Sequence, residues 1–410
     1  MLRSTDRILT SHVGSLLRPV EVMKSIKAKD AQEPYDEDAF AAILDTTIDE
    51  VVREQAKVGI DIVNDGEFSR TSYANYVRDR LSGYEMTKPG GNIIGTLDQV
   101  RFGNLVPGMI RDRERFGDFV QMWRRVERTM FMPEELQSSV SRTTPPEVPV
   151  CTGPIRYRGM DELMVDLNRL KAILSRVDVR GAFVTAASPS IATYHFSNNE
   201  YYATTEEYLF AMADALNVEY KAITAAGFDL QIDAPDLCHM YDPQYLDEYM
   251  SWLSVRIEAI NQALKGIPEE RARLHVCWGS GNTPHTKDVP LRVIIDQVLK
   301  VKAQGYSLEG ANDRHAHDVL MWEDVKLPEG KILMPGVVGH VSNIVEHPDL
   351  VAWRIKLYAE RVGKENVIAG TDCGYSQGWD SRRAHPQVQW AKLESLAEGA
   401  RLATQELWRA

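Results

Sequence analysis

The chain has 410 residues, a formal net charge of −12 and 44% hydrophobic residues, which is enough apolar material for a large core. No basic block offsets the acidic balance, which argues against a non-specific nucleic-acid binder. Arg3, Asp6 and Arg7 interrupt the start of the chain, and no apolar run approaches the roughly 20 residues of a membrane helix. We therefore expect a soluble, cytoplasmic protein without a membrane partner.

Strand and helix patterns alternate along the chain. The predicted strands of the first half are 8–14, 61–66, 149–155 and 181–187, with an amphipathic helix over 39–58. The second half predicts strands over 228–233, 273–277, 306–309, 331–338 and 367–372, and helices over 204–226, 242–264, 288–304, 348–362 and 387–408. Such repeats are typical of a parallel sheet covered by helices.

The pattern predicts an α/β fold: a single (βα)8 TIM barrel over 1–410 with an insertion near the barrel mouth. There are nine strand candidates for eight places, and 149–155 is the first to be set aside. Residues 84–146 break the rhythm, since Pro-Gly-Gly and Thr-Thr-Pro-Pro segments flank a helical piece near 118–130. We interpret 84–146 as the insertion.

Polar side chains follow several of the predicted strands. Glu67, Asp233, Cys277, Glu309 and Cys373 each lie at or just beyond the carboxyl end of a strand. In a (βα)8 barrel these ends converge on one face, where the chemistry is done. Any one of the five could be a satisfied loop residue, but together they indicate a site.

Three of these side chain types can hold a metal. His275 and Cys277 are two apart on a predicted strand, so both point the same way, and Cys373 ends the last strand. Thiolate with imidazole selects zinc, and three protein ligands leave a fourth position open. The alternative is that His275, Cys277 and Cys373 are ordinary buried residues. His285, His315 and His317 compete poorly, because they fall in loops or at a helix start.

Seven short motifs occur in a fixed order. They are Ser11-His-Val-Gly-Ser15, Asn64-Asp-Gly-Glu-Phe68, Gln231-Ile-Asp-Ala-Pro235, His275-Val-Cys277, Ser307-Leu-Glu309, Met334-Pro-Gly-Val-Val338 and Thr371-Asp-Cys-Gly374. In these motifs the chain resembles the cobalamin-independent methionine synthase superfamily. It is similar to the shorter single-barrel branch, which includes the epoxyalkane:coenzyme M transferases. The resemblance covers nearly the whole chain except about 84–146.

The resemblance implies roles for individual residues. His275, Cys277 and Cys373 would be zinc ligands, with Glu309 as a fourth ligand that a substrate thiol displaces. Glu67 and Asp233 would hold the amino group of an amino thiol, and Ser15 would help to bind its carboxylate. The zinc would activate the thiol as a thiolate that attacks an electrophilic carbon.

The chain also departs from the synthase pattern. It has no room for the second barrel with which synthases bind folate, and Ala234 stands where the pattern has a glutamate. Gly339-His340 replaces an acidic residue and a histidine after Pro-Gly-Val. His340 is still a candidate catalytic proton donor, with Tyr375 and His195 as alternatives. Arg18, Arg70 and Arg156 are candidates to pair with an anionic group of the substrate, or else surface ion pairs.

The resulting hypothesis is a zinc-dependent alkyl (methyl) transferase acting on a small-molecule thiol and an alkyl donor. Opening of an epoxide by a thiol is the alternative within that class. A zinc hydrolase or lyase would need water on the metal, which a cysteine-rich ligand set disfavours. A non-catalytic zinc- or thiol-binding barrel would not need Glu67 and Asp233. No nucleic-acid partner is expected, and a homo-oligomer is left open.

Overall fold

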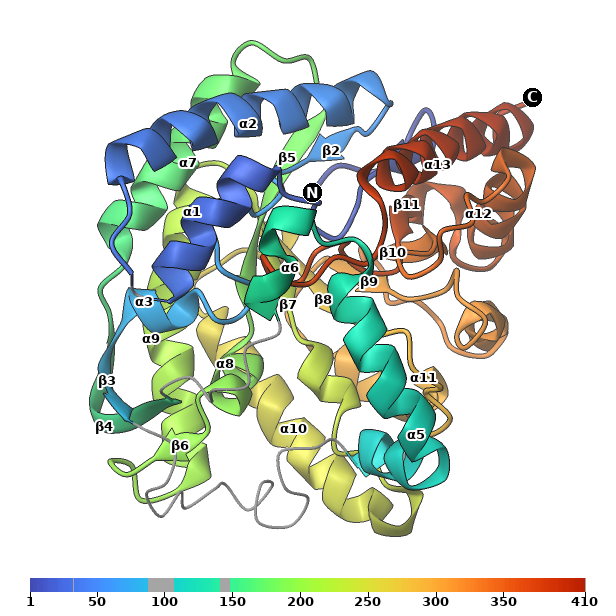
Figure 1. Ribbon diagram of the computed structural model, residues 1–410. Coiled ribbons are helices and arrows are strands. Elements are labelled where there is room, and N and C mark those ends of the chain that lie inside the picture. Colours follow the sequence, from blue (N-terminus) through green and yellow to red (C-terminus); the bar gives the residue numbers. More distant parts are fainter. Residues whose placement is uncertain (32, 88–106, 141–147, 410) are drawn as a thin grey trace.

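The computed structural model describes residues 1–31, 33–87, 107–140 and 148–409. Eight parallel strands form one sheet in the order β1-β11-β10-β9-β8-β7-β5-β2 (Figure 1). The strands are β1 Leu9–Thr10, β2 Ile62–Val63, β5 Gly181–Ala187, β7 Asp229–Asp233, β8 Ala272–Val276, β9 Gly305–Leu308, β10 Ile332–Val338 and β11 Ile368–Thr371. Neighbouring strands of this sheet pair in parallel, as connections through helices require.

The two edges of this sheet meet. Ser11, directly after β1, forms a parallel bridge with Ile62 of β2, and its hydroxyl donates to the Ile62 carbonyl over 3.2 Å. This bridge joins the last pair of strands and gives the nearly closed ring of a TIM barrel. The predicted fold class is confirmed.

The ninth strand candidate belongs to a different sheet. β4 (Val148–Tyr157) pairs antiparallel with β3 (Leu81–Thr87) and parallel with β6 (Asn198–Asn199). Setting 149–155 aside was therefore correct. Residues 84–87, at the start of the predicted insertion, are part of β3. Met86 and Thr87, which the sequence grouped with the Pro-Gly-Gly segment as loop, are therefore strand residues. Their partner strand lies more than sixty positions along the chain, so no local pattern indicates the pairing.

Helices cover the outside of the barrel. The α-helices are α1 Val20–Asp30, α2 Glu37–Lys57, α3 Val77–Arg80, α5 Pro107–Met130, α6 Glu134–Val140, α7 Met160–Leu174, α8 Pro189–His195, α9 Thr205–Ala225, α10 Leu246–Ala263, α11 Leu291–Val298, α12 Pro348–Val362 and α13 Pro386–Leu407. Short 3₁₀ turns are η1 Pro235–Cys238, η2 Pro243–Tyr245, η3 Glu269–Arg271, η4 Ala316–Glu323 and η5 Lys364–Asn366.

Most predicted helices agree with these bounds. The Thr204 hydroxyl accepts from the Glu207 N–H over 3.1 Å and caps α9, as its sequence motif predicts. The helix predicted over 288–304 is shorter, because Pro290 has no N–H to donate and marks its start. The helix then ends after Val298 in tight turns that lead into β9.

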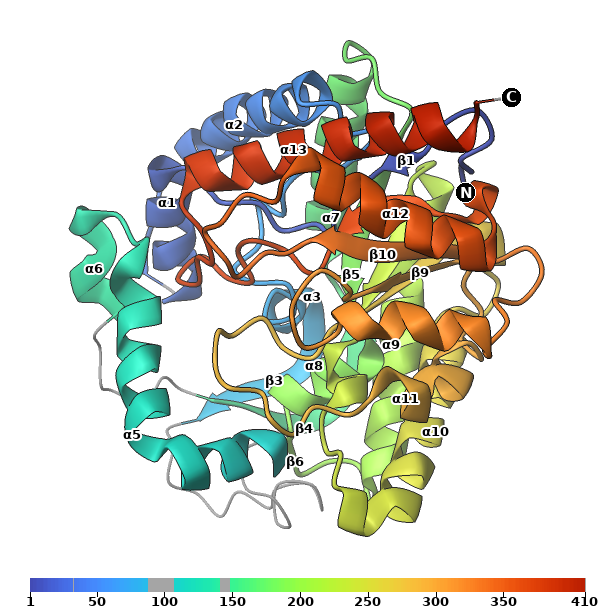
Figure 2. The same cartoon turned by 90° about the vertical axis from the view of Figure 1, so that its right-hand side faces the viewer.

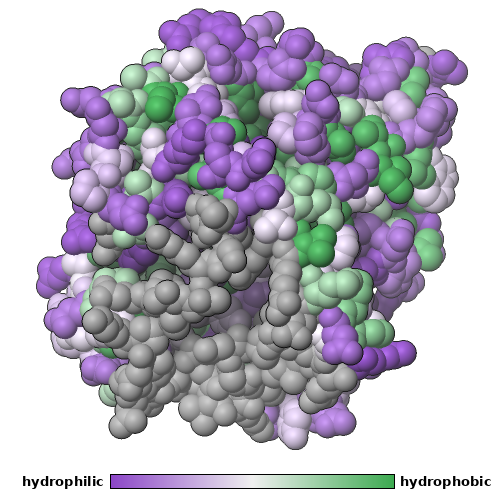
Figure 3. Space-filling model, viewed as in Figure 1, coloured by the Kyte–Doolittle hydropathy of each residue, from purple (hydrophilic) through white to green (hydrophobic). Residues whose placement is uncertain are grey.

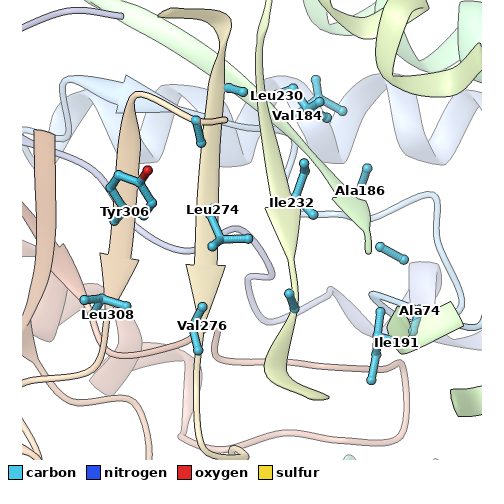
Figure 4. Packing of buried hydrophobic residues seen from close by; sticks show 14 of the residues in the cluster. Ala74, Val184, Ala186, Ile191, Leu230, Ile232, Leu274, Val276, Tyr306 and Leu308 are labelled. Carbon is cyan, nitrogen blue, oxygen red and sulfur yellow. The ribbon is translucent and has the colours of Figure 1, made fainter. Parts of the chain in front are cut away.

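Alternating strand residues divide the core into two layers. Val184, Ile232 and Leu274 belong to the large apolar cluster that also includes residues of the helices, and Figure 4 shows their side chains on the neighbouring strands β5, β7 and β8. Their inward neighbours at the amino-terminal end of the barrel form a separate apolar cluster of Leu9, Ile62, Phe183, Ile332, Met334 and Ile368. This cluster fills that end of the barrel, so a cavity is open to ligands at the other end.

The described parts of the predicted insertion 84–146 lie on the mouth side. Figure 2 shows α5 and α6 together, on the side to which the strand ends point. Met132 and Leu136 pack on Met23 of α1, and Glu127 of α5 pairs with Arg383 over 2.7 Å. Residues 88–106 and 141–147 lie outside the described residues, so the insertion stays a prediction.

Among the described residues, no helix has the length and apolar character needed to cross a membrane. On the face shown in Figure 3, hydrophobic residues lie scattered among hydrophilic ones over most of the coloured surface.

Candidate active site

A cavity of about 530 Å³ opens at the carboxyl ends of the barrel strands. Its inner end is lined by Ser15, Glu67, Asp233, His275, Cys277 and Cys373. Its outer part is lined by α8, by the loops after β7, β8 and β11, and by Glu127 of α5. The volume is that of an ordinary small-molecule site.

His275, Cys277 and Cys373 meet at the inner end. One ligand atom of each lies within 4.8 Å of the others, and this is the one such group among the described residues. All three side chains are buried. The Sγ atoms of Cys277 and Cys373 are 3.9 Å apart. Two sulfurs bound to one tetrahedral zinc at about 2.3 Å would be about 3.8 Å apart, so the spacing fits zinc.

The His275 ring is oriented as a metal ligand would be. Its Nδ1 lies 3.2 Å from the Ser307 hydroxyl, and its buried Nε2 has no hydrogen-bond partner. A buried nitrogen without a partner is unfavourable unless something binds it, and a ligand histidine is commonly held through its other nitrogen. The donor set of one imidazole and two sulfurs therefore fits zinc.

The two cysteines differ in their acidity. The neighbouring Cys277 thiol stabilises a thiolate on Cys373, and together with His275 it holds the pKa of Cys373 well below its usual range despite burial. The pKa of Cys277 is raised by its hydrogen bond to Cys373 and by burial. One of the two sulfurs is thus ready to bind a cation at neutral pH.

Asp372 fixes the strand end that places Cys373. Its Oδ1 accepts from the N–H groups of Gly310 and Ala311, each over 2.8 Å. Its Oδ2 accepts from the Asn312 amide over 2.8 Å. The end of β11 is thereby tied to the loop after β9, which explains how a cysteine so distant in sequence reaches the His275–Cys277 pair.

Glu309 does not belong to the group of ligand atoms. Its Oε1 accepts from the Trp278 N–H over 2.8 Å. Its Oε2 accepts from Asn312 over 2.6 Å and from Arg314 over 2.9 Å. Burial raises the pKa of Glu309, and the Arg314 charge opposes the rise. The structure thus brings Glu309 close to the cluster but engages both oxygens elsewhere.

Two carboxylates stand beside the cluster. Glu67 has a left-handed backbone (φ 61°), and its Oε1 accepts from the Thr185 hydroxyl over 2.9 Å, while its buried Oε2 has no partner. Asp233 accepts from the Gln231 amide over 2.7 Å. Burial raises the pKa of both carboxyls. An unpaired carboxylate oxygen at the cavity surface is suited to a cationic group of a ligand.

Glycines allow the close packing here. A Cβ on Gly14, whose φ is 137°, would lie 2.7 Å from Glu67 Oε1, and one on Gly374 would lie 2.1 Å from the Ser15 hydroxyl. These contacts explain the glycines in the Ser11–Ser15 and Thr371–Gly374 motifs. Ser15 faces the cavity, as predicted for a substrate-binding residue, while its role stays a prediction.

Arg18 lies beneath the site and does not line the cavity. Its guanidinium donates to the Ser376 carbonyl and hydroxyl and to the carbonyls of Glu67 and Arg70. Arg70 likewise donates to the Thr185 carbonyl and hydroxyl. Both guanidiniums bind the backbone that holds the site, so the structure does not support direct pairing of Arg18 with a substrate.

Three further predicted residues lie away from the cavity. Arg156 is exposed on β4 in the outer sheet, because that segment is not a barrel strand. His340, just after β10, is fully buried; neither ring nitrogen has a partner, and burial lowers its pKa. Tyr375 is also fully buried. None of the three lines the cavity, so none is placed to protonate or bind a ligand there.

Ring side chains that sequence patterns missed form one wall of the outer cavity. Tyr73 and Tyr194 line it with His195 and His239. Tyr73 lies ten residues after the end of β2, so the search for polar residues at strand ends did not identify it. Of these four residues, only His195 was a candidate in the sequence analysis. His285 lines the rim and binds Asp288 over 3.0 Å. His315 is buried and stacks on Trp278 at 4.0 Å.

Comparison with known proteins extends over the whole chain. No family model matches it. A methionine synthase of Thermococcus kodakarensis is 24% identical over 98% of this chain and 94% of its own length. A methionine synthase of Saccharolobus solfataricus is also 24% identical, over 98% of this chain and 96% of its own.

Solved structures agree with these sequence matches. A B12-independent methionine synthase from Shewanella sp. W3-18-1, in complex with selenomethionine, superposes with a TM-score of 0.67 at 18% identity, covering 98% of this chain and 100% of that one. A putative vitamin-B12 independent methionine synthase from Listeria monocytogenes gives a TM-score of 0.61, 18% identity and the same coverage. The likeness is therefore one of the whole fold.

Proposed function

Because the chain is a single-barrel relative of the cobalamin-independent methionine synthases, as its motifs predicted, we propose that it is a zinc-dependent methyltransferase acting on the sulfur of an amino thiol. The observation that supports this most directly is the geometry of the inner cavity. A partnerless His275 nitrogen faces two sulfurs 3.9 Å apart, directly beside two carboxylates.

His275, Cys277 and Cys373 would hold the zinc, and Glu309 is proposed as a reserve ligand that exchanges with the substrate. When bound, zinc lowers the pKa of a coordinated thiol and keeps it nucleophilic at neutral pH. The chain supplies the remaining conditions. Ser307 fixes the His275 ring, Asp372 fixes the loop of Cys373, and burial excludes bulk water from the sulfur.

The charges near the cluster favour an amino thiol over a sulfonate thiol. Glu67 and Asp233 would bind an ammonium group, with Ser15 beside them for a carboxylate. A sulfonate would need a free cation instead. The cationic side chains among the described lining residues are Lys287, Arg382 and Arg383, which all lie on the outer loops. This arrangement favours homocysteine-like acceptors and disfavours the coenzyme M type of reaction.

The same carboxylates separate catalysis from zinc storage. A barrel that only stored zinc would gain nothing from burying Glu67 and Asp233, since burial of unpaired carboxylates costs stability. A hydrolase would use a water on the metal, and two cysteine ligands reduce the metal charge that activates water. Methyl transfer to sulfur explains both the ligand set and the acidic neighbours.

The test is to measure zinc content and then follow the zinc coordination by X-ray absorption during titration with homocysteine, coenzyme M and glutathione. We expect one zinc per chain and one additional zinc–sulfur contact with homocysteine. An added sulfur with coenzyme M and none with homocysteine would reverse the choice of acceptor. No zinc under any loading condition would overturn the proposal.

The acceptor pocket can be tested by Glu67→Gln. Loss of one charged partner of an ammonium group is expected to raise the KM for homocysteine by about ten- to a hundredfold. The KM for 2-mercaptoethanol, which has no ammonium, should change less than twofold. Equal changes for both thiols would show that Glu67 acts on the fold and not on the amino group.

A further inference from the structure

The four rings of the outer cavity form a continuous wall. Tyr73 contacts His195 with ring centroids 6.1 Å apart, and His195 contacts Tyr194 at 5.9 Å. Tyr194 in turn contacts His239 at 5.5 Å. All four line the cavity. The wall therefore runs from Tyr73 to His239 without a break.

The Tyr73 end of this wall lies beside the reacting centre. Tyr73 lines the same cavity as Cys277 and Cys373. Burial raises the pKa of its phenol well above the usual range, and the two nearby cysteines add to the rise. A donor that reaches the two sulfurs through this cavity passes along the wall.

The composition of the wall suits a cationic donor. Successive rings cross at 84°, 86° and 60°, so they turn their faces in different directions. Tyr73 and Tyr194 are the two rings of this wall whose faces can attract a methylated cation through cation–π contacts.

The charge of the cavity agrees with a cationic ligand. Its lining holds five carboxylates and three cationic side chains. Arg383 pairs with Glu127 over 2.7 Å, and Asp288 pairs with Arg314, which is not among the lining residues. The other lining carboxylates are Glu67, Asp233 and Asp380, against Lys287 and Arg382, whose guanidinium donates to the Phe131 carbonyl over 2.9 Å. Desolvation lowers the pKa of His195 and of His239 to about 4, so both imidazoles are neutral at pH 7 and do not repel a cation.

We propose that this wall is the donor subsite and that the methyl donor is an onium compound, a sulfonium or a quaternary ammonium ion. The inference rests on the proposed methyltransferase function. The acceptor sulfur, as a thiolate, donates an electron pair to the methyl carbon, and a new carbon–sulfur bond forms. The bond between that carbon and the onium atom breaks, and its electron pair stays on the leaving sulfide or amine.

The leaving group departs neutral and needs no proton, while the proton of the acceptor thiol goes to solvent. This matches a wall with neutral imidazoles and a phenol, none of which is a strong acid at pH 7. Leaving groups such as an alkoxide or a pterin nitrogen would require protonation.

The experiment uses zinc-loaded protein with saturating homocysteine and equal concentrations of deuteromethyl-labelled donors. The donors are S-methylmethionine, glycine betaine, methyltetrahydrofolate and methylcobalamin, and labelled methionine is measured by mass spectrometry. We expect label from one or both onium donors, and the two arms distinguish sulfonium from ammonium. Label from methyltetrahydrofolate or methylcobalamin alone overturns the onium inference and leaves the methyltransferase proposal standing.

Binding provides a second readout that does not depend on turnover. By calorimetry, Tyr194→Leu should weaken binding of the active onium donor about five- to thirtyfold, while Tyr194→Phe, which keeps the ring face, should change it less than twofold. Tyr201→Leu, at a half-exposed tyrosine that does not line the cavity, is the matched control. Equal binding by wild type and Tyr194→Leu, or no onium binding at all, overturns the inference.

Discussion

The same strands form both ends of the barrel, but the side chains inside the barrel are apolar at one end and polar at the other. At the amino-terminal end, inward residues such as Leu9, Phe183 and Ile332 form a dry apolar cluster. At the other end, the residues that follow the strands are Glu67, Asp233 and the three potential zinc ligands, all buried around a cavity. One end closes the fold and the other end is free to bind.

The cavity end also holds buried polar atoms that lack a hydrogen-bond partner. Around the cavity, Glu67 Oε2, His275 Nε2 and His239 Nδ1 are buried without a partner, and so is Asp236 Oδ2 at η1. Such orphans are rare in folded proteins, and each costs roughly 1–3 kcal/mol. Buried atoms without a hydrogen-bond partner also occur at the amino-terminal end, such as Asp229 Oδ1 and Arg271 Nη2, but those two residues form an ion pair over 3.1 Å. The orphan atoms around the cavity indicate that stability is given up there for a ligand, a metal or both.

The largest effect is expected from the metal cluster. Cys277→Ala should abolish stoichiometric zinc binding and lower turnover by at least about a hundredfold, because two protein ligands hold zinc poorly. Zinc is measured by atomic emission after gel filtration, with Cys151→Ala as control, since Cys151 is buried in β4 away from the cavity. Retained stoichiometric zinc in both Cys277→Ala and Cys373→Ala would contradict the ligand assignment.

Sequence alone predicted much of this contrast. Short apolar segments that alternate with helices gave the barrel strands, and the rule that strand ends converge indicated that Cys373 would come close to His275 and Cys277. The rule worked because it depends on topology and not on side-chain detail. For the same reason it placed Glu67 and Asp233 together, although they are more than 150 positions apart.

The rule that strand ends converge does not predict the direction in which a side chain points. Arg18 follows a strand end, but its guanidinium turns back to bind the backbone of Glu67, and only packing decides that choice. His340 follows β10 yet lies behind the cavity wall. Tyr73 was missed because it lies on no strand end. A local sequence pattern does not predict which rings from distant segments will lie together in a cavity wall.

The apolar end of the barrel can be destabilised without changing the potential zinc ligands at the other end. Phe183→Ala should lower the free energy of unfolding by about 3–5 kcal/mol, since it removes a ring that packs at 3.5 Å beneath the Arg273 guanidinium in the closed layer. Urea unfolding followed by circular dichroism measures this. The folded fraction at low temperature should still bind one zinc. If zinc is lost from folded protein as well, the two ends are coupled and the comparison fails.

The smallest effect concerns Asp236, whose carboxyl has an orphan oxygen. Burial raises its pKa to about 6, while hydrogen bonds from Ser190 and Ser188 and the charge of Arg256 lower it less. The folded state therefore holds this proton where the unfolded state, with a pKa near 3.9, has lost it. The stability that this proton contributes is present below about pH 4 and is lost as pH rises through about 6.

Asp236→Asn removes this titration. The unfolding free energy of the variant relative to wild type should rise by about 1–3 kcal/mol between pH 4 and pH 8, as measured by urea unfolding at both values. Asp349→Asn, at an exposed carboxylate on α12, should show no such change. If the difference in unfolding free energy between Asp236→Asn and wild type were the same at pH 4 and pH 8, ionisation of the Asp236 carboxyl would not destabilise the fold. The contrast between the two ends of the barrel would then not extend to this residue.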